Sequence, residues 1–355
     1  YKKKVLITGH TGFKGSWLTS WLLKYKANIV GISKDVPTIP SHYKILGLKR
    51  SIKEYFFDIE NNKKIKKVII KERPDFIFHL AAQAIVSKSF NDPYTTWKSN
   101  TFGILNILET LRKVKKKTYV VFITSDKSYK NVEVNRGYKE EDILGGDDPY
   151  SASKGSAEIL INSYIKSFFN KKKTNIFIST ARAGNVIGGG DWAKDRIVPD
   201  CIRAWSTGKS VDIRNPNATR PWQHVLEPLS GYLSLAQQLQ ADITLNGEGF
   251  NFGPRAEQNR TVQELLEDSC KHWNISPEKA TQLKTTLKTV GEALSSFAGG
   301  ELGASLKQVG TSILSFLSGK ESPVEEMLKL AEKDDELKFK FYFSEAIFDT
   351  IVPIN

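Results

Sequence analysis

The sequence has few of the residues that mark disulfide-rich, metal-binding or membrane-spanning proteins. Cys201 and Cys270 are its two cysteines, and their wide separation argues against a disulfide framework and against cysteine-based metal binding. No stretch approaches the ~20 consecutive apolar residues of a transmembrane helix, and no cleavable signal is expected before the first predicted strand. We therefore expect a cytoplasmic protein without a bound metal, rather than a membrane or secreted one.

The composition is otherwise that of a globular protein with an excess of positive charge. The 355 residues are 40% apolar and 26% charged, enough for one large domain or two. Much of the net charge of +13 comes from short lysine runs at residues 63–64, 115–117 and 171–173. A solvated lysine-rich surface explains these runs, and it would also attract an anionic substrate. Nucleic-acid binding is not expected, because the lysines are not interleaved with aromatic residues.

Short apolar runs alternate with helical stretches over residues 1–184, which we predict to form a dinucleotide-binding domain. Repeated strand–helix–strand units join by right-handed crossovers and build a parallel sheet. The predicted fold class is α/β, a Rossmann-type parallel sheet with helices on both faces. Strands are predicted at residues 5–7, 29–32, 76–80, 119–123 and 176–180, and helices at 16–24, 101–113 and 150–169.

The character of the chain changes after residue 184. Residues 185–273 are rich in turns and prolines, as expected of a smaller substrate lobe over the carboxyl edge of the sheet. We predict that residues 274–355 form a third, divergent or appended helical segment.

Two similar stretches in this last segment predict a helical hairpin. Apolar residues recur at spacings of four and three over residues 283–297 and again over 302–316, and the two stretches share residues at an offset of 19. The hairpin would turn at Gly299-Gly300. We interpret it as a packing module, with contact to a membrane or a partner as the alternative. Residues 337–343 are predicted to form an edge strand.

A glycine turn follows the first predicted strand and opens the first predicted helix. In the stretch Gly9-His10-Thr11-Gly12-Phe13-Lys14-Gly15 the glycines are three apart. This spacing lets the backbone turn tightly and approach a pyrophosphate at the helix N-terminus. The predicted cofactor-binding residues of this turn are Gly9, Thr11, Gly12, Phe13 and Gly15.

The end of the second strand leaves the choice between NAD and NADP open. Asp35 would bind the ribose hydroxyls of NAD, whereas Lys34 could accept the 2′-phosphate of NADP. Asp58, with Ile59 after it, is placed to meet the adenine ring, as in many such domains.

A second motif has a phenol and an ammonium four residues apart. Tyr150 and Lys154 would share one face of the predicted helix, and a cation beside a phenol favours the phenolate, which can take an alcohol proton. A Tyr and a Lys at this spacing often lie on a helix surface without a functional role. A functional role for the pair is supported by the segment Thr124-Ser125-Asp126-Lys127, which follows a buried strand at the edge of the sheet where ligand chemistry is expected. The alternative is that Asp126 only caps the loop.

Together these motifs resemble the extended short-chain dehydrogenase/reductase family, and within it the nucleotide-sugar 4,6-dehydratases. The Ser125-Asp126-Lys127 triplet is similar to that of the CDP-glucose branch, which has Lys where the dTDP-glucose enzymes have Glu. The resemblance covers about residues 4–273 and includes two long stretches, 181–192 and 220–229. The residues that carry it, in chain order, are the glycine turn, Leu80-Ala81-Ala82-Gln83, Asn100, the triplet, and Tyr150 with Lys154.

The resemblance implies an NAD-dependent lyase. Tyr150 would take the proton of the sugar 4-hydroxyl, with Lys154 and Ser125 beside it, while C4 gives hydride to NAD. Lys127, kept neutral by burial, would then remove the C5 proton, Asp126 would protonate the departing 6-hydroxyl, and hydride would return to C6. Leu80, Ala81, Ala82, Gln83 and Asn100 are implied to contact NAD, and Asn185, Arg196, Arg220 and Arg255 to hold the substrate diphosphate.

The implied substrate is CDP-glucose or a similar nucleotide sugar. Two alternatives stay open from the sequence: a related UDP-sugar dehydratase or epimerase, and a dinucleotide-binding protein without turnover whose last segment is an interaction module. The family also implies a homodimer or a dimer of dimers, packed through the long helices of the dinucleotide domain.

Overall fold

The computed structural model describes residues 3–134, 136–169, 174–273, 275–276 and 280–283. The chain divides into two compact units. The first comprises the chain up to Asp195 together with residues 219–260, and the second begins with residues 196–218 and resumes at Thr261. The predicted hairpin and the predicted edge strand at 337–343 lie outside the described residues.

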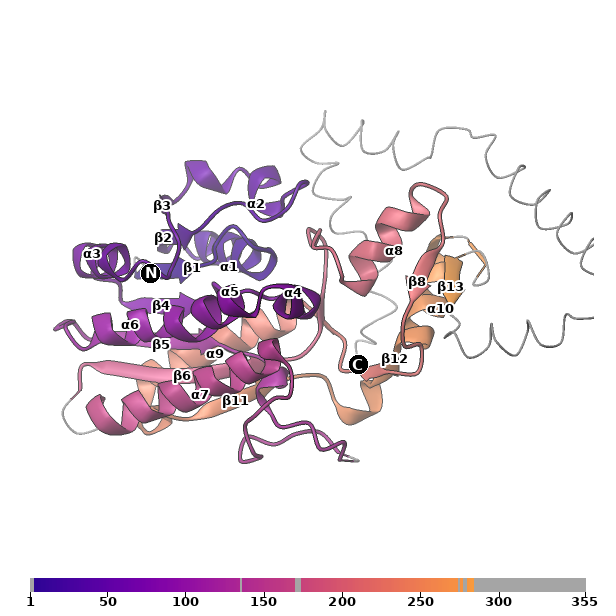
Figure 1. Ribbon diagram of the computed structural model, residues 1–355. Coiled ribbons are helices and arrows are strands. Elements are labelled where there is room, and N and C mark those ends of the chain that lie inside the picture. The colour runs from indigo at the N-terminus through magenta and orange to yellow at the C-terminus, as the bar shows by residue number, and fades with distance from the viewer. Residues whose placement is uncertain (1–2, 135, 170–173, 274, 277–279, 284–355) are drawn as a thin grey trace, which may run out of the picture. The chain divides into compact units, whose positions relative to one another are not determined.

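The first unit is built on a seven-stranded sheet in which every pairing is parallel (Figure 1). Its central strands are almost wholly apolar, and all six residues of β5 are buried, because a parallel sheet is covered on both faces. In spatial order the strands are β11 (Gly249–Phe252), β6 (Ile176–Ala183), β5 (Thr118–Ile123), β4 (Phe76–His79), β1 (Lys4–Thr8), β2 (Asn28–Ser33) and β3 (Lys53–Phe56).

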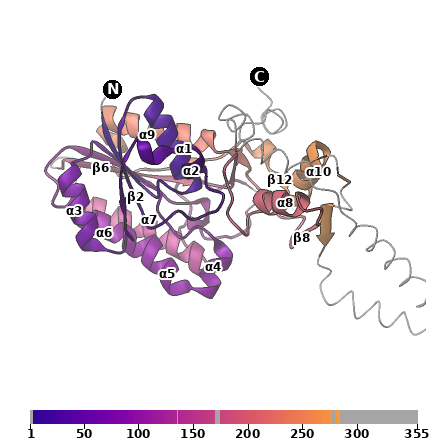
Figure 2. The ribbon, with the colours of Figure 1, turned by 90° about the horizontal axis from the view of Figure 1, so that it is seen from above.

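Helices cover both faces of this sheet, as Figure 2 shows from above. Helices α1 (Phe13–Lys24) and α9 (Leu226–Ala241) lie on one face, and α3 (Asn62–Glu72), α6 (Gly103–Leu111) and α7 (Pro149–Phe168) on the other. Alternate residues of a strand feed the two layers: Val120 packs toward α3, α6 and α7, whereas Tyr119 packs with Phe177 and Leu239 of α9. Burying side chains on both faces contributes ~25 cal/mol for each Å² of apolar surface.

Shorter elements fill the connections of the first unit. They are α2 (His42–Ile45), η1 (Leu48–Arg50), α4 (Val86–Asn91), α5 (Pro93–Trp97), η2 (Lys98–Phe102), η3 (Asp126–Ser128), β7 (Val186–Ile187), β9 (Thr219–Arg220), β10 (Gln223–His224), η4 (Ile243–Leu245) and η5 (Ala256–Gln258).

The second unit has its own small core. It contains α8 (Ile197–Trp205), β8 (Val211–Ile213), α10 (Val262–Trp273) and β13 (Thr281–Leu283), and β12 (Arg260–Thr261) spans its boundary with the first unit. Cys201 and Cys270 are both buried in this core as free thiols, and burial raises the pKa of Cys201 to about 12.

The parallel Rossmann-type sheet confirms the predicted fold class, with two corrections to the details. Residues 226–252, which we placed in the substrate lobe, return to the sheet as α9 and β11. Leu283, the expected first apolar position of the hairpin, lies instead in β13, which pairs in parallel with β8. No helix among the described residues is long and apolar enough to cross a membrane.

Candidate active site

The glycine turn joins β1 to α1 with almost no room for side chains. Gly9 has φ +75°, and an added Cβ would lie 2.8 Å from the backbone nitrogen of Ala81. A Cβ on Gly15 would lie 2.0 Å from the carbonyl oxygen of Gly9. At Gly12 the nearest atom would be 3.4 Å away, and this N-cap residue has no side chain to cap α1. The N-terminus of α1 therefore has no side-chain cap, and such a helix N-terminus suits an anionic ligand.

A buried polar cluster ties this turn to β2 and β3. His10 shares a hydrogen bond of 2.8 Å with Ser33 Oγ, and its Nε2 lies 3.3 Å from Glu54. The Thr11 amide donates to Ser33 Oγ, and its hydroxyl donates to the carbonyl oxygen of Asp35 at 2.6 Å. The Thr11 side chain therefore holds the loop in place. Burial lowers the pKa of His10.

Lys34, which directly follows β2, forms an ion pair with an acidic side chain. Its ammonium forms an ion pair of 2.9 Å with Asp58, which also accepts a hydrogen bond from the amide of Glu60. Although partial burial opposes it, the amide and Lys34 together hold the pKa of Asp58 below its usual value. Asp58 and Ile59 thus stand beside the end of β2, and Ile59 is buried under Gly103.

The segment after β4 is held by Asn100. Its side chain accepts from the Gln83 amide at 2.8 Å and donates to the Gln83 carbonyl at 3.1 Å and to Ser153 Oγ at 3.0 Å. Ala81 donates to Thr8 Oγ1, so Leu80, Ala81 and Ala82 follow the rim of the glycine turn. Asn100 therefore links this rim to α7.

The Ser125-Asp126-Lys127 triplet begins the short helix η3 at the carboxyl end of β5. Ser125 is buried, is the N-cap of η3, and donates from Oγ to Asp126 Oδ1 at 2.9 Å. Asp126 is half-buried, and its Oδ2 is 3.5 Å from the position of a Cβ added to Gly184. The expected burial of Lys127 is wrong, since its side chain is exposed.

Tyr150 and Lys154 lie on the first two turns of α7, both buried. Asp148 caps the helix by accepting from the amides of Tyr150 and Ser151. The Lys154 ammonium is 5.9 Å from the centre of the Tyr150 ring. Burial lowers the pKa of Lys154 to about 8, with Glu158 acting in the opposite direction. Because η3 packs against α7, the triplet and the pair share one edge of the sheet.

The predicted substrate residues are placed in different ways. Gly184 lies against Pro221 beside Asp126, so the backbone of the neighbouring Asn185 and Arg220 passes near the triplet. The amide of Gln223 donates to the Asn185 carbonyl. Arg220 donates to its neighbour's carbonyl at Thr219. Arg255 is exposed at the start of η5. Arg196 is the N-cap of α8 in the second unit.

Motif reasoning missed four buried residues of this region. Glu158 and Arg182 form an ion pair, which the four-residue spacing from Lys154 to Glu158 on one helix face could have indicated. Trp222 Nε1 and Tyr232 Oη are buried without a hydrogen-bond partner among the described residues. Burial, together with the negative charge of Asp126, raises the pKa of Tyr232.

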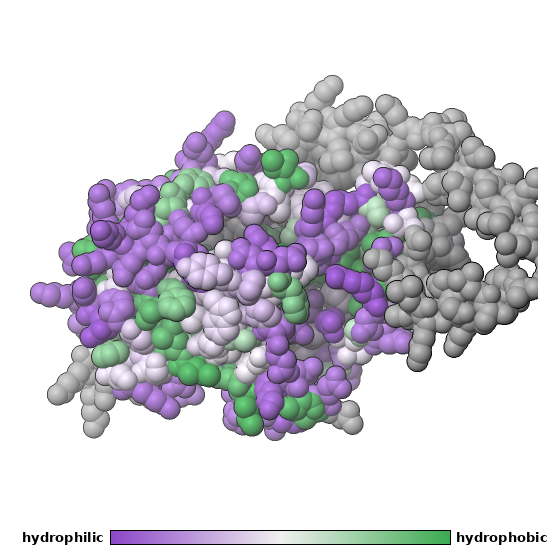
Figure 3. All heavy atoms as spheres, viewed as in Figure 1, coloured by the Kyte–Doolittle hydropathy of each residue, from purple (hydrophilic) through white to green (hydrophobic). Residues whose placement is uncertain are grey.

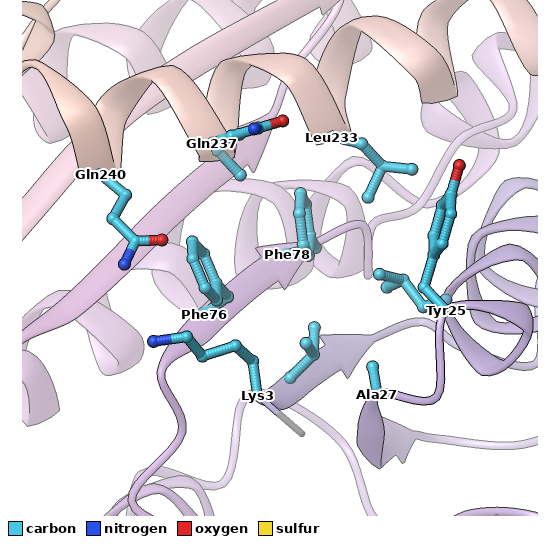
Figure 4. Close-up of a pocket in the computed structure, with 11 residues that line it drawn as sticks. Lys3, Tyr25, Ala27, Phe76, Phe78, Leu233, Gln237 and Gln240 are labelled. Carbon is cyan, nitrogen blue, oxygen red and sulfur yellow. The ribbon is translucent and has the colours of Figure 1, made fainter. Parts of the chain in front are cut away.

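A cavity of about 190 Å³ lies elsewhere, at the amino ends of β1 and β4 beneath α9 (Figure 4). Phe76, Phe78 and Leu233 point into it, with Lys3 and Gln240 at its rim. It is smaller than the roughly 300–1,000 Å³ of small-molecule sites and lies at the edge of the sheet opposite the triplet. We therefore do not include it in the candidate site.

The fold and the edge on which these side chains gather place the chain in the short-chain dehydrogenase/reductase class, as the sequence resemblance implied. A family model described as GDP-mannose 4,6 dehydratase matches residues 6–292. The chain belongs to this family. The match runs beyond residue 273, where we expected the resemblance to end.

Individual relatives and solved structures give a more specific comparison than the family model. The chain is 44% identical over 274 residues to the CDP-glucose 4,6-dehydratase of Salmonella typhimurium, covering 76% of each chain. Its fold is similar to that of a dTDP-glucose 4,6-dehydratase from Bacillus anthracis in complex with NAD (TM-score 0.66, 20% identity, covering 80% of this chain and 85% of that chain). A UDP-glucose 4-epimerase from Thermus thermophilus in complex with NAD is also similar (TM-score 0.67, 22% identity, 79% and 85% covered).

Proposed function

We propose that the protein is an NAD-dependent lyase that converts CDP-glucose to CDP-4-keto-6-deoxyglucose. The observation that carries the proposal is the Ser125-Asp126-Lys127 segment, packed as η3 against the helix of Tyr150 and Lys154. An acid and an amine beside a Tyr-Lys pair provide for a dehydration as well as an alcohol oxidation. The 44% identity to a CDP-glucose 4,6-dehydratase supports the choice of reaction and of nucleotide.

The glycine turn fits a dinucleotide. Gly9 and Gly15 close the turn tightly, whereas Gly12 leaves space above the uncapped N-terminus of α1, where a pyrophosphate would accept from backbone amides. Lys34 is already paired with Asp58, which favours NAD over a cofactor with a 2′-phosphate. NAD, when bound, would supply the acceptor and donor of hydride for the sugar carbons. Leu80, Ala81, Ala82, Gln83 and Asn100 would line its nicotinamide side.

The side chains then divide the proton transfers among them. Tyr150 Oη takes the proton of the sugar 4-hydroxyl, Lys154 favours the phenolate by its charge, and Ser125 Oγ hydrogen-bonds the same sugar oxygen. Lys127 removes the C5 proton as a general base, and Asp126 as a general acid gives a proton to the departing 6-hydroxyl, which leaves as water. Hydride returned to C6 and a proton returned to C5 from Lys127 then complete the 6-deoxy sugar. Each positioned acid or base is worth roughly 10²–10⁴-fold in rate.

Cationic and amide side chains would hold the substrate diphosphate. Asn185 and Arg220 flank the Gly184–Pro221 contact beside Asp126, and a guanidinium suits bidentate phosphate binding. Arg255 is a further candidate in the first unit. The formal charge of +13 would favour the approach of such an anionic substrate.

The test is an assay for the 4-keto-6-deoxy sugar, whose ketone forms an ultraviolet-absorbing enolate in alkali. CDP-glucose with NAD should give this absorbance, and the UDP- and dTDP-glucose arms should give much less. A preference for UDP-glucose would reassign the substrate. Absence of product from every nucleotide sugar would overturn the proposed function.

The role of Asp126 can be tested in the same assay. Asp126→Asn keeps the size of the side chain but cannot donate a carboxyl proton, so we expect product formation to fall by roughly 10²–10⁴-fold while oxidation at C4 persists. Transient NADH absorbance on mixing with CDP-glucose measures the oxidation separately. Release of product by Asp126→Asn at the wild-type rate would contradict the assignment.

We also propose that the protein self-associates through helices of the first unit. Elements α4, α5, η2 and α7 pack against one another, and they expose Phe90, Tyr94, Phe102 and Ile159, each more than half accessible. Figure 3 shows apolar residues among polar ones on the face over helices α5–α7. A patch of exposed apolar side chains on packed helices is typical of an interface between subunits.

A further inference from the structure

A buried ion pair joins the helix of Tyr150 and Lys154 to the neighbouring strand of the sheet. Glu158 on α7 is 4% exposed, and Arg182 on β6 is 7% exposed. Arg182 Nε donates to Glu158 Oε1 at 3.0 Å, and Nη2 donates to Oε2 at 2.9 Å. Such parallel bidentate bonds fix the relative orientation of two groups as well as binding them.

Both ends of the triplet segment are attached to this pair. Thr124, directly before Ser125, donates its hydroxyl to Glu158 Oε1. Tyr129, directly after η3, accepts from Arg182 Nη1 at 2.6 Å through its phenolic oxygen. The ion pair therefore holds the segment between Thr124 and Tyr129 against α7 from both sides.

The polar groups around the pair are satisfied, as a buried network requires. Thr180 Oγ1 donates to Glu158 Oε2 at 2.9 Å, and Arg182 Nη1 also donates to the Glu140 carbonyl at 3.1 Å. The Tyr129 hydroxyl in turn donates a hydrogen bond to Asn251 Oδ1 at 2.8 Å. The network thus links α7, β5, β6 and β11 at one edge of the sheet.

Glu158 of this pair also affects the protonation of Lys154. Lys154 and Glu158 are four residues apart on one face of α7, one turn from each other, and Lys154 is buried. Glu158 favours the ammonium form, whereas burial disfavours it. The titratable and charged groups on the elements packed against α7 are Asp126 and Lys127 on η3, Lys88 on α4, Tyr94 on α5, Lys98 on η2 and Glu109 on α6. The charge of Lys154 also acts on His79 of β4, and Arg182 of β6 is joined to α7 through Glu158.

We propose that Glu158 and Arg182 are positioning residues: Glu158 keeps Lys154 charged, and the pair holds the Ser125–Lys127 segment in register with Tyr150. Neither residue needs to touch the substrate for this role. The kinetic part of the inference rests on the proposed function, whereas the effect on Lys154 is a property of the protein alone.

The effect on Lys154 can be measured without cofactor or substrate. In protein with ¹³C-labelled lysine side chains, the Cε resonance of Lys154 is assigned by its absence in Lys154→Arg and followed against pH. Glu158→Gln leaves the Arg182 cation uncompensated, so the Lys154 titration should move to lower pH. Arg182→Met leaves the Glu158 anion uncompensated, so it should move to higher pH. Shifts in one direction for both variants, or no shift in either, would overturn the proposal.

A double variant separates positioning from folding. Glu158→Gln/Arg182→Met removes both buried charges together, a change that proteins often tolerate without loss of stability. With the bidentate link lost and Tyr129 released from Arg182, kcat for product should fall by roughly 10²-fold and KM should change little. A folded double variant with the wild-type kcat and pH profile would contradict the positioning role proposed for Glu158 and Arg182.

Glu72→Gln is the control, because the buried Glu72 carboxylate pairs with the partly exposed Lys4 and Lys53 at the opposite edge of the sheet. It should leave both kcat and the Lys154 titration unchanged. If the wild-type protein forms no product at all, the proposed function fails, and the Lys154 titrations still decide the role of the pair.

Discussion

Lys154 shows how a single side chain is shaped by its surroundings. Its place one turn after Tyr150 is a matter of spacing, but its burial is not visible in the motif. Burial lowers its pKa to about 8, and Glu158 limits the fall. A lysine that releases its proton this readily is poorly hydrated, and holding it charged at neutral pH costs stability.

Lys154→Met should therefore stabilise the protein while abolishing turnover. The folded pKa lies below the usual value of 10.5, so the unfolded chain binds more protons between about pH 8 and 10.5. The cost of Lys154 is then full below pH 8 and is relieved as the pH rises through that window. At pH 7 we expect Lys154→Met to raise the free energy of unfolding by roughly 1–3 kcal/mol.

Urea unfolding at pH 7 and pH 10 measures this difference, which should shrink at the higher pH. Lys127→Met is the control, since Lys127 is exposed and its loss should change stability by less than about 0.5 kcal/mol. A Lys154→Met variant less stable than wild type at pH 7 would contradict the expectation.

Among the elements, the turn between β1 and α1 is specified most closely by its residues. Gly15 has no room for a methyl group because the Gly9 carbonyl lies where a Cβ would go, whereas a Cβ on Gly12 would make only an ordinary contact with the Gly9 oxygen, at 3.4 Å. Gly12 and Gly15 therefore have different roles, although both belong to the same glycine motif. Gly15 allows the helix to pack on the turn, and Gly12 leaves the approach to the helix N-terminus open.

Substituting these two glycines should separate folding from cofactor binding. Gly15→Ala brings a Cβ within 2.0 Å of a backbone oxygen, so we expect a loss of at least about 3 kcal/mol of stability. Gly12→Ala meets nothing closer than 3.4 Å, so stability should change by less than about 1 kcal/mol, while NAD affinity falls about tenfold or more, since each 1.4 kcal/mol is tenfold.

Urea unfolding without cofactor and calorimetric titration with NAD provide the two readouts. Wild-type stability of Gly15→Ala would mean that the turn can relax. Wild-type NAD affinity of Gly12→Ala would place the pyrophosphate elsewhere.

In the molecule as a whole, the first unit carries the candidate site and the proposed contact between copies on different parts of one sheet. The site residues gather at the carboxyl ends of β1, β4 and β5. The exposed apolar residues lie on the outer surface of helices that cover one face of the same sheet. Residues of α7 serve both, since Tyr150 and Lys154 are buried and Ile159 is exposed.

Ile159→Lys should weaken self-association by placing a charge in an apolar contact. We expect sedimentation velocity at micromolar concentration to show a shift from dimer toward monomer, with the fold retained by circular dichroism. Ile143→Lys is a matched control, because Ile143 is 74% exposed in the loop before α7. A wild-type protein that is monomeric, or equal dissociation by both variants, would rule out this surface.

Part of this picture is local and could be predicted from the sequence. Apolar runs of strand length and the 3.6-residue period of helices identified most of the sheet, because side-chain alternation is set by the backbone of each element. The glycine turn and the Tyr150–Lys154 spacing were found for the same reason. The strands β3 and β11 escaped prediction because they are short and only half-buried, so their sequences show weak alternation.

The rest depended on which elements become neighbours. The engagement of Lys34 by Asp58 joins β2 to the chain after β3, and the Glu158–Arg182 pair joins α7 to β6. The exposure of Lys127 follows from the path of the chain through η3. The sequence by itself determined the fold class and the chemistry available at the edge of the sheet, because spacing along one helix or turn is a local property. Tertiary structure alone decided which charges are paired and which are buried, since these depend on contacts between residues far apart in the chain.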